Sequence, residues 1–161
     1  MELTFGKITE FERGTLYSLL KDAYSFDDRY QKAFDRDWLT FDQFFYDNPC
    51  IAENFGFMTV LNGEPIGHIS WDPRKRPEYV QIGHNCIAAR YKGKGYGKLQ
   101  LREAVDRIKA YPDLRRIIVE TNSNLIAPKN YESVGFRLYD RKENHTETAF
   151  SGDYLEYEIL L

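Results

Sequence analysis

Hydrophobic residues recur at two spacings along the chain: every second residue, which predicts a strand, and every three or four residues, which predicts a helix. The run "LTFGKI" at residues 3–8 alternates apolar and polar positions, as a half-buried strand does. Thr9, with Glu12 three residues later, is typical of a helix capping box. We therefore expect a helix to follow, with these residues on its apolar side: Phe11, Leu16, Leu19, Leu20 and Ala23.

Residues 24–48 carry an aromatic stripe. Tyr30, Phe34, Trp38 and Phe41 recur every three or four residues, which places them on one face of a predicted helix. Aspartates lie between the aromatic residues. One interpretation is a face that packs on the core. The other is a lid over a substrate pocket, with Tyr30, Phe34 and Trp38 as substrate-binding residues.

The middle of the chain reads as a three-stranded meander. "FGFMTVL" and "EPIGHISW" flank Asn62-Gly63, a pair that suits a type I′ hairpin turn. A third strand is expected in "YVQIGHNCI", after the loop "DPRKRPE". If that strand is regular, His84 and Cys86 share one face and Asn85 and Ile87 share the other.

Helical spacing returns after residue 95. Leu101, Ala104, Val105 and Ile108 predict an amphipathic helix, and "RRIIVET" predicts a strand. A short helix should end at Gly135, a C-cap residue, before the closing strands "FRLYD" and "DYLEYEILL". The order predicts an α/β (α+β) fold with a mixed sheet and one parallel pair around residues 80–120.

Composition narrows the class of protein. The 161 residues are 42 % hydrophobic and 16 % aromatic, so we expect one domain spanning residues 1–161 with a packed core. A net charge of −3 argues against a nucleic-acid partner. Cys50 and Cys86 show no metal-site or CxxC spacing, and neither a signal peptide nor a membrane span is evident. We expect a soluble, cytoplasmic protein without a membrane partner.

The densest positive charge lies in "ARYKGKGYGKLQ", residues 89–100. A strand precedes this glycine-rich stretch and a helix follows it, an order that points backbone N–H groups and a helix N-terminus at a bound anion. The Walker A pattern fails because Lys92 and Leu99 stand where glycine and serine or threonine are needed, and the dinucleotide pattern fails at Lys98. A tight turn with solvated lysines is the other interpretation.

Two motifs together resemble the GNAT N-acetyltransferases. "IAARYKGKGYGKLQL" is similar to the family's acetyl-coenzyme A loop, with Lys92 where the pattern has Gln or Arg. "NLIAPKNYESVGF" resembles a later family motif, and five residues fall in step with it: Asn124, Ala127, Tyr131, Gly135 and Phe136. The resemblance covers the whole chain and implies a sheet of about seven strands flanked by about four helices. Pro128 departs from the motif, and it would fit a helix that begins near Ala127.

The resemblance implies acetyl-coenzyme A as the co-substrate, with no metal. The pyrophosphate would lie on the loop, and the end of the third strand would pair with the pantetheine arm. The cofactor-binding residues are then Cys86, Ile87, Ala88, Lys92, Gly93, Lys94, Gly95, Tyr96, Gly97, Lys98, Asn124, Ala127 and Tyr131. Asn124 is equally suited to capping its own helix.

The resemblance also assigns a general acid. Tyr131 matches the tyrosine that protonates the departing thiolate, although packing against the core would also explain it. A base for the amine is expected at His84, with Glu120 and Glu78 as alternatives and a structural histidine as the other interpretation of His84. Cys86 is expected to be a small strand residue rather than an acetylated nucleophile.

The acceptor would be a primary amine of a small molecule or a peptide. The same residues could instead make a non-catalytic acyl-coenzyme A-binding module, whereas a nucleotide phosphotransferase lacks its motif. The family is often dimeric, and an edge strand such as "YLEYEILL" would offer a homodimer interface.

Overall fold

The computed structural model describes residues 2–161 as seven strands, five α-helices and three short 3-10 helices. The strands are β1 (Leu3–Gly6), β2 (Gly56–Leu61), β3 (Glu64–Asp72), β4 (Val80–Ile87), β5 (Arg116–Asn122), β6 (Arg137–Lys142) and β7 (Tyr154–Leu160). The α-helices are α1 (Thr15–Ala23), α2 (Asp28–Asp47), α3 (Pro49–Asn54), α4 (Tyr96–Lys109) and α5 (Ala127–Val134). The 3-10 helices are η1 (Ile8–Glu10), η2 (Ala89–Tyr91) and η3 (Ala149–Ser151).

The strand order is β1-β2-β3-β4-β5-β7-β6. The β4–β5 pair is parallel, whereas β1–β2, β2–β3, β5–β7 and β6–β7 are antiparallel. This mixed, mostly antiparallel sheet confirms the predicted fold class. The short helix α3 was not predicted, although a proline in its first turn is a common start signal.

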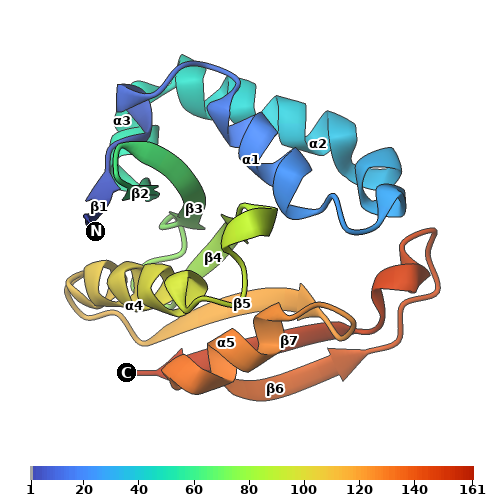
Figure 1. Cartoon of the computed structure of the whole chain (residues 1–161). Coiled ribbons are helices and arrows are strands. Elements are labelled where there is room, and N and C mark those ends of the chain that lie inside the picture. Colours follow the sequence, from blue (N-terminus) through green and yellow to red (C-terminus); the bar gives the residue numbers. More distant parts are fainter. Residues whose placement is uncertain (1) are drawn as a thin grey trace. The chain divides into compact units, whose positions relative to one another are not determined.

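The chain divides into two compact units, and β4 and α4 each contribute to both. The first comprises residues 2–70 and 84–100. In it, α1 and α2 lie side by side (Figure 1). The β2–β3 hairpin turns at Asn62 (φ 50°) and Gly63 (φ 83°), which confirms the predicted turn.

The capping box predicted at Thr9 is wrong. The Thr9 hydroxyl donates to Glu53 of α3, and α1 begins only at Thr15, after Gly14 (φ 98°). The cap comes from α2, because the buried Asp42 carboxylate accepts from the backbone N–H groups of Gly14 (3.1 Å) and Tyr17 (3.0 Å). A capping group 28 residues away leaves no local signal in the sequence.

The second unit comprises residues 71–83 and 101–161. Leu101, Ala104, Val105 and Ile108 of α4 are buried, as their spacing predicted. Pro128 lies in the first turn of α5, and Gly135 ends that helix with φ 107°, as predicted.

The prediction that "YLEYEILL" forms an edge strand is wrong. β7 pairs with β5 on one side and β6 on the other, so β1 and β6 are the edges of the described sheet. Five of the six β6 residues are exposed, as expected of an edge strand, whereas Leu155 and Tyr157 of β7 are buried.

Candidate active site

The glycine stretch forms a turn between η2 and α4 in the first unit. Gly93 (φ 75°) and Gly95 (φ 88°) adopt left-handed conformations that other residues take up only with strain. Apart from the two adjacent residues, no part of the described chain lies within 4 Å of the position a Cβ would occupy at either glycine. The first helical bond runs from the Leu99 N–H to the Gly95 carbonyl, so the preceding N–H groups of this turn have no acceptor within the helix.

Lys92, the residue that departs from the family pattern, is turned toward α1. Its ammonium donates to the Ala23 carbonyl and lies 4.7 Å from the centre of the Phe26 ring. A cation at the carboxyl end of a helix is favourable. Burial lowers the pKa of the Lys92 ammonium. Lys94 is exposed, with its ammonium 5.9 Å from the Tyr91 ring.

The end of β4 keeps the predicted alternation of its side chains. His84 lies against Phe41 of α2, with 4.3 Å between ring centres, whereas Asn85 accepts from Gln100 of α4. Ile87 and Cys86 are buried, and the Ala88 N–H donates to the Ile66 carbonyl of β3 (2.7 Å). Burial raises the pKa of the Cys86 thiol to about 12, so a reactive thiolate is disfavoured.

Gln100 is a site residue that the sequence reasoning missed. Its side chain is fully buried, and its amide nitrogen donates to the carbonyls of His68 (3.0 Å) and Cys86 (3.2 Å) and to Asn85 (2.8 Å). Its oxygen accepts from the Thr59 hydroxyl (2.7 Å). One side chain therefore ties the first turn of α4 to β2, β3 and β4. The spacing Gln100, Ala104 and Ile108 places it on the buried face of the helix, which was an available signal.

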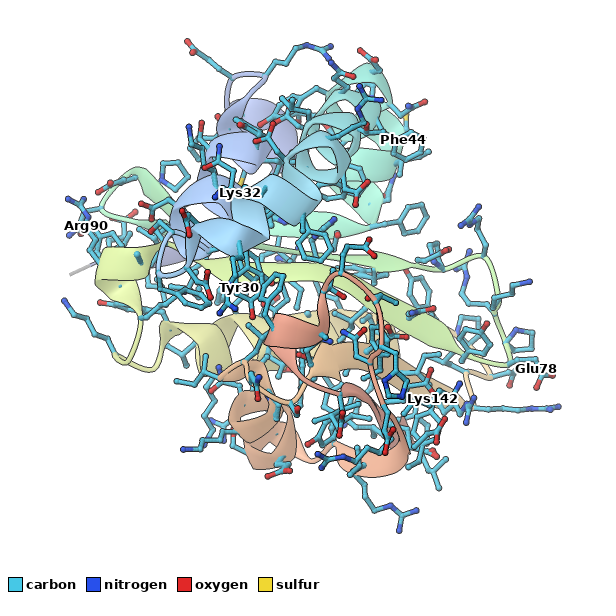
Figure 2. All side chains as sticks on the ribbon, turned by 90° about the vertical axis from the view of Figure 1, so that its right-hand side faces the viewer. Tyr30, Lys32, Phe44, Glu78, Arg90 and Lys142 are labelled. Carbon is cyan, nitrogen blue, oxygen red and sulfur yellow. The ribbon has the colours of Figure 1, made fainter. Side chains whose placement is uncertain are left out.

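The aromatic stripe on α2 is largely covered. Tyr30 and Trp38, two of the predicted substrate-binding residues, are 4 % and 3 % exposed. Phe34 is half-buried between them, 6.4 Å from each ring centre. Tyr30 and the exposed Lys32 lie on different sides of α2 (Figure 2).

The second motif forms α5 and the turns around it, in the second unit. Tyr131 is buried against Phe136 and Tyr157, with ring centres 5.5 Å and 6.1 Å apart. The alternative that Asn124 caps α5 is wrong, because Ile126 holds the N-cap position. The Asn124 side chain instead donates to the Phe150 carbonyl (3.0 Å).

The alternative bases Glu120 and Glu78 lie in different surroundings. Glu120 of β5 lies directly opposite Glu156 of β7. Partial burial raises the pKa of the Glu120 carboxyl and Glu156 raises it further, whereas Lys142 opposes the shift. Glu78 is exposed and paired with Arg115 at 3.0 Å, so its carboxylate already has a partner.

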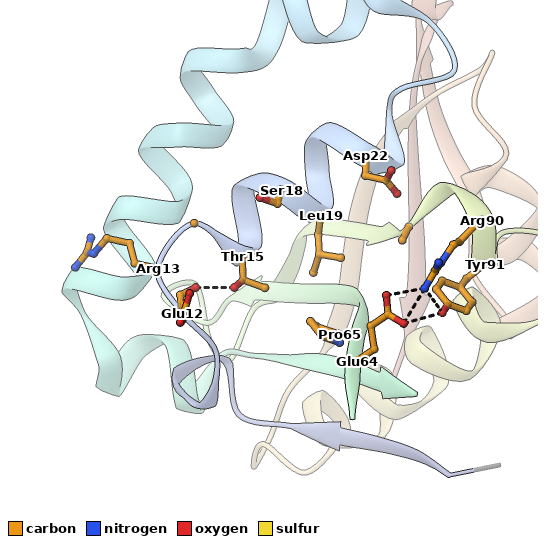
Figure 3. A pocket seen from close by; sticks show the side chains of 12 residues that line it. Glu12, Arg13, Thr15, Ser18, Leu19, Asp22, Glu64, Pro65, Arg90 and Tyr91 are labelled. Atoms are coloured by element: carbon orange, nitrogen blue, oxygen red, sulfur yellow. Dashed lines mark hydrogen bonds and ion pairs between the residues drawn. The ribbon is translucent and has the colours of Figure 1, made fainter. Parts of the chain in front are cut away.

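A polar pocket of about 560 Å³ lies in the first unit beside η2 (Figure 3). Of the predicted cofactor-binding residues, only Ala88 lines it. Two of its carboxylates are already engaged: Asp22 accepts from the Ala89 N–H (2.8 Å), and Glu64 is paired with Arg90 at 2.7 Å. The pocket is lined by Glu12, Arg13, Gly14, Thr15, Ser18, Leu19, Asp22, Glu64, Pro65, Ala88, Arg90 and Tyr91.

The fold and the glycine turn are those expected of an acyltransferase, and the comparisons with known proteins name its family. The profile of the acetyltransferase (GNAT) family matches residues 14–136, and the chain belongs to that family. No curated protein sequence matches significantly. Within residues 2–161, no helix is long and apolar enough to cross a membrane.

Solved structures share the fold at low sequence identity. The PaiA N-acetyltransferase from Thermoplasma acidophilum, in complex with coenzyme A, has a TM-score of 0.79 and 14 % identity, with 100 % of each chain covered. An IAA acetyltransferase from Bacillus cereus has a TM-score of 0.69 and 20 % identity, and the match covers 99 % of this chain and 100 % of that one. The ribosomal-protein-S18-alanine N-acetyltransferase from Escherichia coli has a TM-score of 0.70 and 17 % identity, and the match covers 99 % of this chain and 94 % of that one.

Family membership confirms the predicted enzyme class, an acetyltransferase, and its predicted co-substrate, acetyl-coenzyme A. Enzymes of this family act on amine acceptors.

Proposed function

We propose that this chain, as a single domain, transfers the acetyl group of acetyl-coenzyme A to a primary amine of a small molecule or a peptide by direct attack. The observation that carries the proposal is the turn at Gly93 and Gly95. Its two left-handed glycines precede the amino end of α4 and are not crowded by other residues of the chain. A turn of this kind suits a pyrophosphate, which needs several N–H donors and close approach to the backbone.

The cofactor-binding roles follow the loop and the strand before it. The backbone of residues 94–98 would bind the pyrophosphate, with Lys94 and Lys98 adding positive charge. Lys92 would hold the loop to α1, since its ammonium is bonded to Ala23. Residues 86–88 would pair with the pantetheine arm. Asn124, Ala127 and Tyr131 are assigned to the cofactor by the second motif.

The chemistry needs a proton acceptor for the amine and a proton donor for the thiolate. We assign the donor to Tyr131 on its place in the second motif. We assign the acceptor to His84, with Glu120 as the alternative. Burial lowers the pKa of the His84 imidazole, with Asp37 opposing, which keeps His84 unprotonated at neutral pH. Cys86 takes no covalent part, because its thiol is neutral.

Two of the structural neighbours are named for different acceptors, and at 17–20 % identity they show the fold alone. Phe34, half-buried on α2, is the best placed of the three proposed substrate-binding residues, because Tyr30 and Trp38 are buried. The two free cysteines suit a reducing, cytoplasmic setting, and a homodimer would use the exposed edge β6.

Thiol release from acetyl-coenzyme A tests the proposal. A panel of small primary amines and of peptides with free amino termini or lysines is offered to the purified chain. We expect release that depends on at least one amine and an acetylated product in the mass spectrum. Coenzyme A binding without turnover on any member of the panel would instead favour a non-catalytic binding module.

A further inference from the structure

His68, in the middle of β3, is buried in an unusual way. Its side chain is 0 % exposed, and neither ring nitrogen has a hydrogen-bond partner among residues 2–161. A neutral imidazole carries one donor and one acceptor, and leaving either unpaired away from water is costly. The two nitrogens therefore call for a partner that the described part of the chain does not supply.

His68 and His84 lie against the same phenyl ring. The ring centre of Phe41 is 5.5 Å from that of His68 and 4.3 Å from that of His84, and Phe45 covers His68 edge-on at 6.2 Å. The two histidines come from adjacent strands, β3 and β4.

The backbone contacts fix how the two histidines are placed. Ala88 bonds to Ile66, and Gln100 bonds to the carbonyls of both His68 and Cys86. Residue 86 therefore lies beside residue 68, and His84 lies two residues further along β4 on the same face. Such diagonal neighbours are about 7–8 Å apart at Cα, a separation that one water molecule between two rings would bridge.

The charged and titratable groups around the pair leave His68 neutral. The charge of Asp37 of α2 raises the pKa of His84. On β4, the charge of Lys92 lowers the pKa of Cys86 and that of Asp22 raises it. Burial, and then the neighbouring His84, lower the pKa of the His68 imidazole to about 3. His68 is therefore not the final proton acceptor, but it keeps one donor and one acceptor across the physiological range.

We propose that His68 is a positioning residue for His84, linked to it through one bound water molecule. The link fixes which nitrogen of His84 carries its hydrogen and leaves the other nitrogen unprotonated toward the acceptor amine. This inference rests on the role of His84 in the proposed function. As the new N–C bond forms and the thioester C–S bond breaks, the amine proton moves to the unprotonated nitrogen of His84. The hydrogen already on His84 stays and donates to the water, which donates to His68, while Tyr131 protonates the thiolate.

Histidine NMR of the free protein tests the link without relying on catalysis. The chain has three histidines, and the exposed His145, 2.9 Å from Glu143, provides an internal reference. We expect two-bond ¹H–¹⁵N spectra of the wild type to show His84 in a single tautomer. His68→Phe should give a mixture of tautomers and lower the pKa of His84 by about half a unit, since the imidazolium loses an acceptor.

Two variants separate hydrogen bonding from packing. His68→Gln keeps a donor and an acceptor and should restore most of the single tautomer. Phe45→Leu changes the packing on the His68 ring without touching the link, and His84 should titrate as in the wild type. An unchanged tautomer and pKa of His84 in His68→Phe would overturn the proposal.

Kinetics then connect the link to the reaction. In His68→Phe, we expect kcat to fall about tenfold, with KM for acetyl-coenzyme A unchanged and the acidic limb of kcat/KM following the pKa of His84. If His84→Asn retains full turnover, His84 is not the base and the positioning proposal fails. That result would leave acetyl transfer by this chain standing, because thiol release measures transfer independently.

Discussion

Gly67 of β3 lies directly against the Gln100 side chain of α4. A Cβ at residue 67 would lie 2.6 Å from the Gln100 side-chain oxygen and 2.8 Å from the Cys86 carbonyl, both too close for a real contact. The glycine is therefore needed for close approach, since it carries no positive φ. The absence of a side chain at Gly67 leaves room for the buried Gln100 amide, which joins the start of α4 to the end of β4.

Gly67→Ala is expected to lower the free energy of unfolding by about 2 kcal/mol or more, because the added methyl group overpacks this contact. It should also weaken coenzyme A binding by shifting the glycine turn. Urea unfolding and calorimetric titration measure the two effects. In a Gln100→Ala background, the cost of Gly67→Ala should fall by about 1 kcal/mol, since one of the clashing atoms is gone. Strict additivity of the two changes would show that the amide does not carry the contact.

Tyr131→Phe tests the assigned proton donor. Turnover should fall at least about tenfold, because the thiolate loses its acid, while coenzyme A affinity stays roughly intact. Thiol-release assays measure the turnover, and calorimetric titration measures the affinity for coenzyme A. Tyr157→Phe is the matched control, since its hydroxyl is bonded to Glu132 (2.9 Å) on the same helix. Equal turnover in wild type and Tyr131→Phe would remove Tyr131 from the mechanism.

The buried His68 should make the protein sensitive to acid. Its pKa is about 3 in the folded chain, against about 6.5 in the unfolded chain, so below pH 6.5 the unfolded state binds a proton that the folded state does not. Stability is therefore highest above pH 6.5 and falls by up to about 1.4 kcal/mol per pH unit as the pH drops toward 3.

Urea unfolding at pH 7 and at pH 4.5 measures this effect. His68→Phe should lose about 2–3 kcal/mol less than the wild type between these two values, because the titrating ring is gone. An identical pH dependence in both proteins would mean that His68 is not buried as described.

The features that the sequence revealed are local. Three of them depend on residue types that readily adopt a left-handed backbone, so the residue types alone predict them: the glycine turn, the Asn62-Gly63 hairpin and the Gly135 cap. The apolar face of α4 follows from the spacing of its hydrophobic residues.

The features that the sequence concealed depend on partners far along the chain. Asp42 caps α1 from 28 residues away, and Gln100 reaches Thr59 across 41 residues. His68 is an ordinary polar position in a strand when judged from the sequence, whereas in the structure it is buried, with Phe41 and Phe45 of α2 packed against its ring. The place of β7 inside the sheet also depends on long-range pairing, which the apolar run alone does not fix.

The glycine turn is the proposed pyrophosphate site, and titration of coenzyme A into Gly95→Ala tests this role most directly. A methyl group at φ 88° should strain the turn by about 1–2 kcal/mol and weaken binding at least about tenfold relative to the wild type. Gly63→Ala is the control. Gly63 resembles Gly95 in its φ of 83° and its open surroundings, but it lies in the β2–β3 hairpin turn instead of the glycine turn. We predict that Gly63→Ala loses similar stability and keeps wild-type affinity. Equal affinity in Gly95→Ala and the wild type would contradict the account.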